Sequence, residues 1–268
     1  MTTLPQRTPE NDALHRECAL LHEELARLLV ERTTLLELTG PALEARYRLE
    51  LGALQLTVLE AECGVRRLRR KLELLRAALN RGAIPDLAAV SAQLDAELIE
   101  WQARLRAETA RLEAARLWAA APLLGVAEAR ELQELFRRLA KRCHPDASPE
   151  GGAAANALWL QASAAYAAGD LEGLRALALL ADDLPAAGSL AEGVRERRDA
   201  LKAAVARLVA ELAEIGLRFP FTLRDLLDDP ARVEAERQTL TARHDALAAE
   251  RVLLEVTLHA IVGEVAGG

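Results

Sequence analysis

The sequence predicts an all-α fold, and three observations support that prediction. Among its 268 residues, Ala, Leu, Glu and Arg dominate, charged residues make up 28% and aromatic residues only 3%, a mixture typical of long or coiled helices. Leucine recurs at heptad spacing in several segments, as expected where helices pack along a seam. No stretch shows a sustained β-branched alternation, so nothing indicates strands. A chain of this length can form two domains and a substantial core.

The N-terminal region, residues 1–120, is expected to consist of coiled helices. Its clearest signal is an unbroken 3-4-3-4 spacing of nine apolar residues: Leu51, Leu54, Val58, Ala61, Val65, Leu68, Leu72, Leu75 and Leu79. This spacing fills every a and d position of a coiled coil. Gly40-Pro41 precedes the run, and Asn80-Arg81-Gly82 ends it with residues typical of a helix C-terminus.

Two further seams flank this run. An earlier seam extends from Leu14 to Leu35 and is interrupted by Arg32. A later helix should begin at Pro85-Asp86 and carry apolar residues from Leu87 to Leu112. Because the links between these helices are short, we expect the helices to fold back on one another as antiparallel hairpins. The spacing leaves open whether the seams close within one chain or in a homo-oligomer.

The central region, residues 121–182, contains the most informative motif of the chain. A predicted helix there has a basic exposed side, and most of its cations lie in the last turn, where they complement the helix dipole. Its apolar face consists of Leu132, Leu135, Phe136 and Leu139. Directly after this helix comes His144-Pro145-Asp146, and Pro145 cannot continue a helix. The next helix should pack antiparallel to the first and leave this tripeptide exposed. Its apolar face carries Leu158, Ala162 and Tyr166.

A basic helix, an HPD loop and a second helix with Ala-Tyr near its end resemble the J-domain of DnaJ-type proteins. In that family, the helix and the loop bind an Hsp70 (DnaK-type) chaperone and stimulate its ATPase. The resemblance covers residues 127–180. It implies that the basic side chains steer an acidic Hsp70 surface and that the tripeptide couples binding to ATP hydrolysis. The residues that would contact Hsp70 are Arg137, Arg138, Lys141, Arg142, His144, Pro145 and Asp146.

The segment departs from the J-domain pattern in three places. Ala147-Ser148 replaces the usual Lys or Asn after the tripeptide, and Cys143 stands where an aromatic residue often ends the helix. The usual first helix is hard to place, although residues 124–126 match a sequence that commonly closes it. The chain also resembles bacterial proteins that insert a small J-domain between helical segments, in residues 47–82 and 165–174.

The C-terminal region, residues 183–268, is predicted to form a helical hairpin after a linker at 181–188. One helix carries a seam from Val194 to Ile215, and the last helix repeats an apolar residue every seven positions from Val233 to Ile261. The loop between them should be anchored by two aromatic side chains and followed by a short helix at 223–227. The two aromatic residues are Phe219 and Phe221.

Several classes of function are disfavoured. No secretory signal and no transmembrane-length apolar run is present, so we expect a cytoplasmic protein without a membrane partner. The cysteines Cys18, Cys63 and Cys143 lack metal spacing, and the five histidines form no ligand cluster. Phosphate-binding and nucleophile motifs are missing. We therefore expect no catalytic residue, metal or cofactor, and a chain that is not itself an enzyme.

The basic run Arg66–Lys71 allows two interpretations. It could bind an anionic surface, or it could be a solvated helix face paired with acidic residues such as Glu23, Glu24 or Glu97. The net charge of −7 and the pI of about 5.4 disfavour a nucleic-acid partner and favour the second interpretation. The indoles Trp101 and Trp118 are expected to pack at helix crossings.

Two functional hypotheses follow. The first is an Hsp70 co-chaperone whose coiled helices bind a client or partner. The second is a structural or assembly scaffold in which the J-like segment has degenerated and no longer stimulates Hsp70. The intact tripeptide and the basic helix favour the first hypothesis, while the missing first helix and the absent Lys after the tripeptide favour the second.

Overall fold

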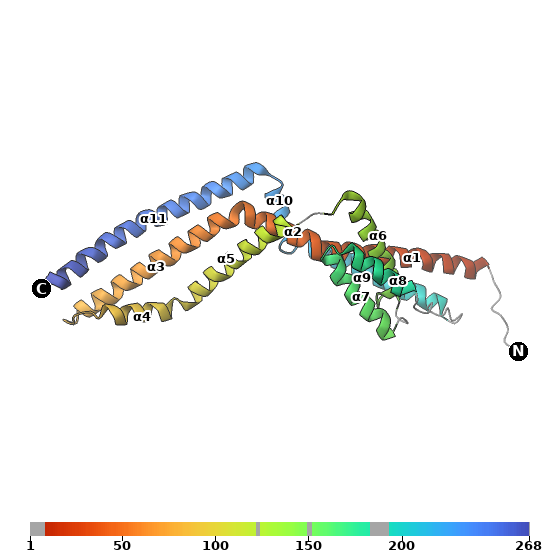
Figure 1. The fold of residues 1–268 in the computed structure, drawn as a ribbon, viewed down its shortest axis with the longest axis horizontal. Coiled ribbons are helices and arrows are strands. Elements are labelled where there is room, and N and C mark those ends of the chain that lie inside the picture. The colour runs from red at the N-terminus through yellow and green to blue at the C-terminus, as the bar shows by residue number, and fades with distance from the viewer. Residues whose placement is uncertain (1–8, 122–123, 149–151, 183–192, 268) are drawn as a thin grey trace. The chain divides into compact units, whose positions relative to one another are not determined.

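The computed structural model describes residues 9–121, 124–148, 152–182 and 193–267. Every regular element in these ranges is helical (Figure 1), so the predicted all-α fold is confirmed. The chain forms two compact units, the first made of residues 1–42 and 122–222 and the second of residues 43–121 and 223–268. Each unit thus combines segments that are distant in the sequence, whereas the sequence suggested three successive regions.

The first unit contains the helices on which the HPD loop rests. Its main elements are α1 (Pro9–Thr34), the π-helical turn η1 (Leu35–Thr39), α6 (Val126–Cys143), α7 (Gly152–Ala167), α8 (Leu171–Asp182) and α9 (Val194–Gly216). After η1, helical structure continues into α2 (Gly40–Tyr47), because the Gly40 N–H donates to the Leu35 carbonyl in a π-helical turn. Gly40-Pro41 therefore lies inside a helical segment and does not form a link.

The helices α1 and α9 pack side by side and run parallel. Near their starts Glu10 pairs with Arg195 at 2.5 Å, and further along Arg32 pairs with Glu211 at 2.7 Å. The predicted seam residues meet between them, and Cys18, Leu25, Leu28, Leu201 and Leu208 are buried in one cluster. Arg32, the polar interruption of the seam, forms this ion pair across the two helices, but its buried Nε makes no hydrogen bond with the described residues.

The second unit is built around one long helix. Its elements are η2 (Arg48–Gly52), α3 (Ala53–Leu79), α4 (Leu87–Glu97), α5 (Ile99–Ala120), α10 (Arg224–Leu227) and α11 (Pro230–Gly267), and the 3₁₀ turn η4 (Phe221–Leu223) precedes α10. The nine predicted seam positions of residues 51–79 are all buried or half-buried. In Figure 1, α11 lies along α3. These two helices are also parallel, because ion pairs join Glu62 to Arg243 and Arg69 to Glu250.

The expected hairpin of the last two long helices is wrong. Helix α9 packs on α1, and α11 packs on α3, so each turns its seam toward an N-terminal helix. In the α11 seam Val233 is buried and the later positions are half-buried. The physical reason is that a heptad pattern defines an apolar face but neither its partner nor its direction. The antiparallel pairing of residues 51–79 with the next helices is confirmed, because Arg48 contacts Glu108 while Arg67 contacts Asp95.

The turn between α3 and α4 has the predicted local structure. Gly82 adopts a positive φ of 71° just beyond the end of α3, a conformation that suits glycine after a helix. The Asp86 side chain then accepts hydrogen bonds from the N–H groups of Ala88 and Ala89 and caps α4. At Leu98 the predicted single helix divides into α4 and α5.

The predicted antiparallel pair of the HPD segment is present, because Phe136 stacks on Tyr166 while His144 contacts Trp159, and α8 adds a third helix that was not predicted. Helices α6, α7 and α8 contact one another, and α1 also packs against α6. Their shared core is aromatic: the Phe136 ring stacks on Tyr166 at 4.2 Å and on Trp159 at 5.1 Å between centroids. The Tyr166 hydroxyl lies 2.8 Å from that of Thr34 on α1. The expected linker at 181–188 begins inside α8, and its residues 183–188 lie outside the described ranges.

Candidate functional site

The HPD loop follows α6 directly, as the sequence predicts. His144 has extended backbone (φ −68°, ψ 133°), which the following proline favours. Its N–H still donates to the Ala140 carbonyl at 3.1 Å, and its own carbonyl accepts from Ala147 at 3.0 Å and Ser148 at 2.7 Å. These bonds close a compact turn that holds the tripeptide at the end of α6.

The three residues of the motif differ in exposure. Pro145 and Asp146 are exposed, but the His144 side chain is only 7% exposed, so the prediction of a fully exposed tripeptide is wrong at the histidine. Its ring packs edge-on against Trp159 at 4.7 Å, and its Nδ1 accepts the Asp146 backbone N–H at 3.0 Å. Burial lowers the pKa of His144 below 6.5, and nearby Arg32 lowers it further while Asp146 opposes both. The imidazole is therefore neutral at neutral pH.

The four basic residues of α6 have different surroundings. Arg137 and Arg138 are exposed and make no hydrogen bond or ion pair with the part of the chain that the structure describes. Lys141 instead pairs with Glu23 of α1 at 2.7 Å. Arg142 donates to the backbone carbonyls of the last two residues of α8, including that of Asp182 at 3.2 Å. Arg137 and Arg138 are thus the two cations of α6 that form no direct ion pair with the described residues, although Arg137 helps to lower the pKa of Glu23.

The loop also rests on the α1–α9 pair. Ala147 is 1% exposed and belongs to the same buried cluster as Leu25 and Leu208. The Asp146 carboxylate lies 3.9 Å from the guanidinium of Arg207 on α9, and both side chains are largely exposed. The end of α6 is therefore fixed by one buried alanine and two surface ion pairs to neighbouring helices.

Sequence analysis did not predict several residues that lie around the loop. Trp159 contacts both Phe136 and His144, and the buried or half-buried positions 155, 159, 162 and 166 show the helical 4-3-4 spacing that would have identified it. His22 of α1 has a buried Nε2 without a hydrogen-bond partner among the described residues. Burial, Lys141 and Arg197 lower the pKa of His22. No local pattern marked His22, because its surroundings come from distant segments.

The thiol at the end of α6 is not activated by its surroundings. Cys143 is fully buried, and burial raises the pKa of its thiol, which keeps it protonated. In the described ranges no group of three or more His, Cys, Asp or Glu side chains could hold a metal ion. Among those same residues, none of the helices combines the length and hydrophobicity that crossing a bilayer requires.

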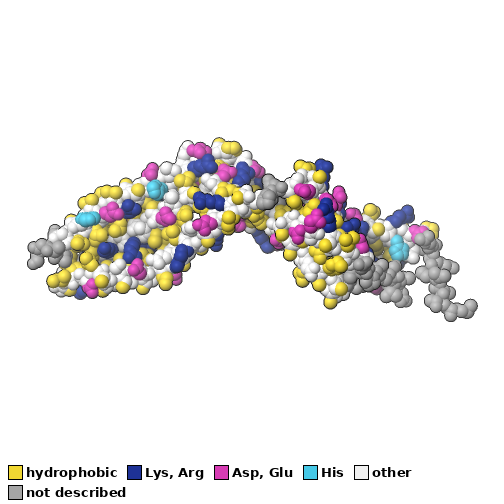
Figure 2. All heavy atoms as spheres, viewed as in Figure 1, with side chains coloured by type: hydrophobic (Ala, Val, Ile, Leu, Met, Phe, Trp, Pro, Cys, Tyr) yellow, Lys and Arg dark blue, Asp and Glu magenta, His cyan; other side chains and the backbone are white. Residues whose placement is uncertain are grey.

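The second basic surface, at residues 66–71, is mostly paired. Lys and Arg side chains are interspersed with Asp and Glu side chains over the visible surface of the helices (Figure 2). The ion pairs are Arg67 with Asp95 at 2.6 Å, Arg69 with Glu250 at 2.6 Å and Arg70 with Glu97 at 2.8 Å. The paired-face interpretation is therefore confirmed for Glu97. Glu23 and Glu24 were wrongly predicted as partners, since they pair with Lys141 and Arg27.

The aromatic side chains outside the HPD segment differ in how far they are buried. Trp101 is half-buried beneath the Arg66 guanidinium, which lies 4.1 Å from the ring centroid. Trp118 is 46% exposed, so its predicted place at a helix crossing is wrong. Phe221 is buried at the loop before α10 and anchors it, while Phe219 is 57% exposed and does not.

Comparison of the chain with protein-family models, with curated proteins and with solved structures finds no match. The resemblance to a J-domain thus stays a prediction that rests on the motif and its surroundings.

Proposed function

We propose that this chain is an Hsp70 co-chaperone that uses α6 and the HPD loop to stimulate the ATPase of a partner Hsp70. One observation supports this more than any other: an exposed Pro145-Asp146 lies one residue beyond a helix on which Arg137 and Arg138 are exposed and form no direct ion pair with the described residues. Neither feature is needed to fold a helical segment. The other helices would bind a client or place the module in an assembly.

The arrangement suggests how such binding would proceed. Arg137 and Arg138 would attract an acidic Hsp70 surface and mainly raise the association rate. Lys141 and Asp146 would then exchange their partners Glu23 and Arg207 for groups on Hsp70. This exchange costs little, because surface ion pairs contribute about 0–1 kcal/mol each.

The test is single-turnover ATP hydrolysis by a bacterial Hsp70, with the full chain titrated in. We expect stimulation by the wild-type chain and loss of most of it in Asp146→Asn, whose side chain is exposed. The matched control is Asp199→Asn, an exposed aspartate of α9 that pairs with its neighbour Arg198, and it should stimulate normally. Equal stimulation by both variants would refute the assigned role of the loop.

A second candidate is a structural scaffold. It is favoured by the buried His144 and Ala147 and by the ion pairs that join the loop to α1 and α9, since a loop used only for packing would have these contacts. In that case neither the wild-type chain nor the variants would stimulate Hsp70. Asp146→Asn would then change only the thermal stability, by less than about 1 kcal/mol.

A further inference from the structure

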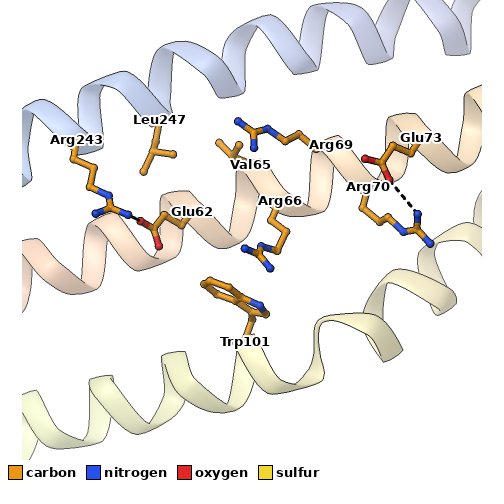
Figure 3. A pocket seen from close by; sticks show the side chains of 9 residues that line it. All are labelled: Glu62, Val65, Arg66, Arg69, Arg70, Glu73, Trp101, Arg243 and Leu247. Carbon is orange, nitrogen blue, oxygen red and sulfur yellow. Dashed lines mark hydrogen bonds and ion pairs between the residues drawn. The ribbon is translucent and has the colours of Figure 1, made fainter.

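The second unit has a groove of about 530 Å³ between α3, α5 and α11 (Figure 3). Its apolar lining comes from all three helices: Val65, Trp101 and Leu247. Guanidinium groups surround this apolar strip, and Figure 3 shows the Arg66 side chain extending from α3 toward the Trp101 ring. The groove therefore joins an apolar floor to a basic edge.

The guanidiniums of the groove differ in whether a carboxylate already satisfies them. Arg69, Arg70 and Arg243 each form an ion pair within the unit. Arg66 makes no hydrogen bond or ion pair with any residue that the structure describes, and neither does Arg104, whose guanidinium lies 5.9 Å from the same Trp101 ring. Two cations around one indole are thus left without a counter-charge.

Stacking on Trp101 also orients Arg66 for binding. A guanidinium over an indole face is held by a cation–π interaction, which leaves the N–H groups along its edge available. A carboxylate accepts two such N–H groups in parallel, and this bidentate contact is among the stronger hydrogen-bonded pairs. The guanidinium of Arg66 is therefore oriented to bind a carboxylate through two parallel N–H groups.

We propose that this groove binds an acidic amphipathic helix of a partner protein. Grooves between packed helices accept the side-chain ridges of a further helix. An apolar side chain of the partner would lie on Trp101 and Leu247 while a neighbouring glutamate or aspartate would bind Arg66. A nucleic-acid backbone fits less well, because Glu62 and Glu73 already pair with Arg243 and Arg70. The groove thus offers Arg66 for one acid and no row of free cations for successive phosphates.

This inference is independent of the co-chaperone proposal. Arg66 and Trp101 belong to the second unit, while the HPD loop and α6 belong to the first. The chain could therefore lose one activity and keep the other, and the two experiments use different probes. If both activities exist, the groove would hold a client or partner that the HPD loop delivers to Hsp70.

The test uses the full chain and a fluorescein-labelled helical peptide with Leu and Glu on adjacent stripes, followed by fluorescence anisotropy. We expect Arg66→Gln to weaken binding about tenfold, as expected for a lost charge-assisted bidentate pair. The matched control is Arg76→Gln, an exposed arginine of the same helix outside the groove, which should bind like wild type. Arg66→Lys, which keeps the charge but loses the planar fork, should lie between them.

Three results would overturn the proposal. The first is equal binding of the acidic peptide by wild type and Arg66→Gln, including no binding by either. The second is equal binding of a peptide with Lys in place of Glu, because the groove would then select only apolar surface. The third is a wild-type dimer in light scattering that Arg66→Gln dissociates, which would assign the groove to a second copy. Unchanged circular dichroism melts would show that the variants fold normally.

Discussion

Two basic helical stretches of this chain resemble each other in sequence but differ in their surroundings. On α6, residues 137–142 place Arg137 and Arg138 in solvent and use Lys141 and Arg142 to contact α1 and α8. On α3, residues 66–71 form ion pairs to α4 and α11 through Arg67, Arg69 and Arg70. Only Arg66 there stacks on an aromatic ring without a carboxylate.

The difference teaches that neighbouring helices decide which cations are available. The basic side of α3 lies between α4 and α5 on one flank and α11 on the other, so carboxylates reach it from both. Helix α6 packs on other helices through its apolar face. Of its basic side chains, only Lys141 and Arg142 therefore reach neighbouring helices that the structure describes. The two stretches therefore carry similar positive charge in the sequence, but α6 leaves more of its positive charge available to a binding partner than α3 does.

The largest expected effect comes from breaking the apolar anchor of α6. Phe136 is fully buried and stacks on two aromatic rings, so Phe136→Ala should destabilise the first unit by about 3–5 kcal/mol. Urea unfolding followed by far-ultraviolet circular dichroism should show this loss. The control is Phe219→Ala, because Phe219 is mostly exposed and its loss should cost less than about 0.5 kcal/mol. Equal midpoints for the two variants would contradict the packing of α6.

An intermediate effect should follow from freeing the HPD loop. The double variant Glu23→Gln and Arg207→Gln removes both ion pairs that engage Lys141 and Asp146. It should raise stimulation of Hsp70 several-fold in the single-turnover assay, since no partner exchange is then needed, and cost at most about 1 kcal/mol of stability per pair. This frees Lys141 in addition to Arg137 and Arg138, while Arg142 keeps its contacts to α8, and it sharpens the contrast with α3.

The control for this variant uses neighbouring ion pairs that do not touch the loop. Glu24 pairs with Arg27 on α1, and Lys202 of α9 pairs with Glu17. The double variant Glu24→Gln and Lys202→Gln should leave stimulation unchanged. A similar rise in both double variants would show that the effect comes from general loosening of the α1–α9 pair.

Much of the local structure could be predicted from sequence. Spacing and backbone preferences predict the apolar faces of α3, α6, α9 and α11, the glycine turn at Gly82 just after α3 and the cap at Asp86. These features depend on residues within a few positions of one another. The all-α fold followed from the same signals.

The pairing of helices could not be predicted in the same way. A leucine seam packs equally well against many other seams, so the parallel pairs α1–α9 and α3–α11 had no local signal. For the candidate site, spacing located the HPD loop and the basic side of α6. It missed the contacts that Glu23, His22 and Arg207 make with this segment, because they come from helices far away in the sequence.

The smallest expected effect is a response to mild acid, and it separates the two stretches again. Burial holds the pKa of His22 and His144 below 6.5, so the unfolded chain binds more protons than the folded chain just below that pH. Their contribution to stability is complete above pH 6.5 and is lost as the pH falls through the lowered pKa values. On α3, Arg70 holds the pKa of Glu97 below 4.5, so this ion pair persists in mild acid.

We therefore expect the urea concentration at the unfolding midpoint of the first unit to decrease as the pH is lowered from about 7.5 to about 5.5. This pH range lies above the carboxylate titrations. The midpoint should change less with pH in His22→Gln and in His144→Gln, because each variant removes one group that resists protonation. His15→Gln is the control, since His15 is exposed on the same helix as His22, and it should keep the wild-type slope. A slope that is the same in all four proteins would mean that neither histidine is held neutral by its surroundings, and the loop would then be as open to solvent as the basic side of α6.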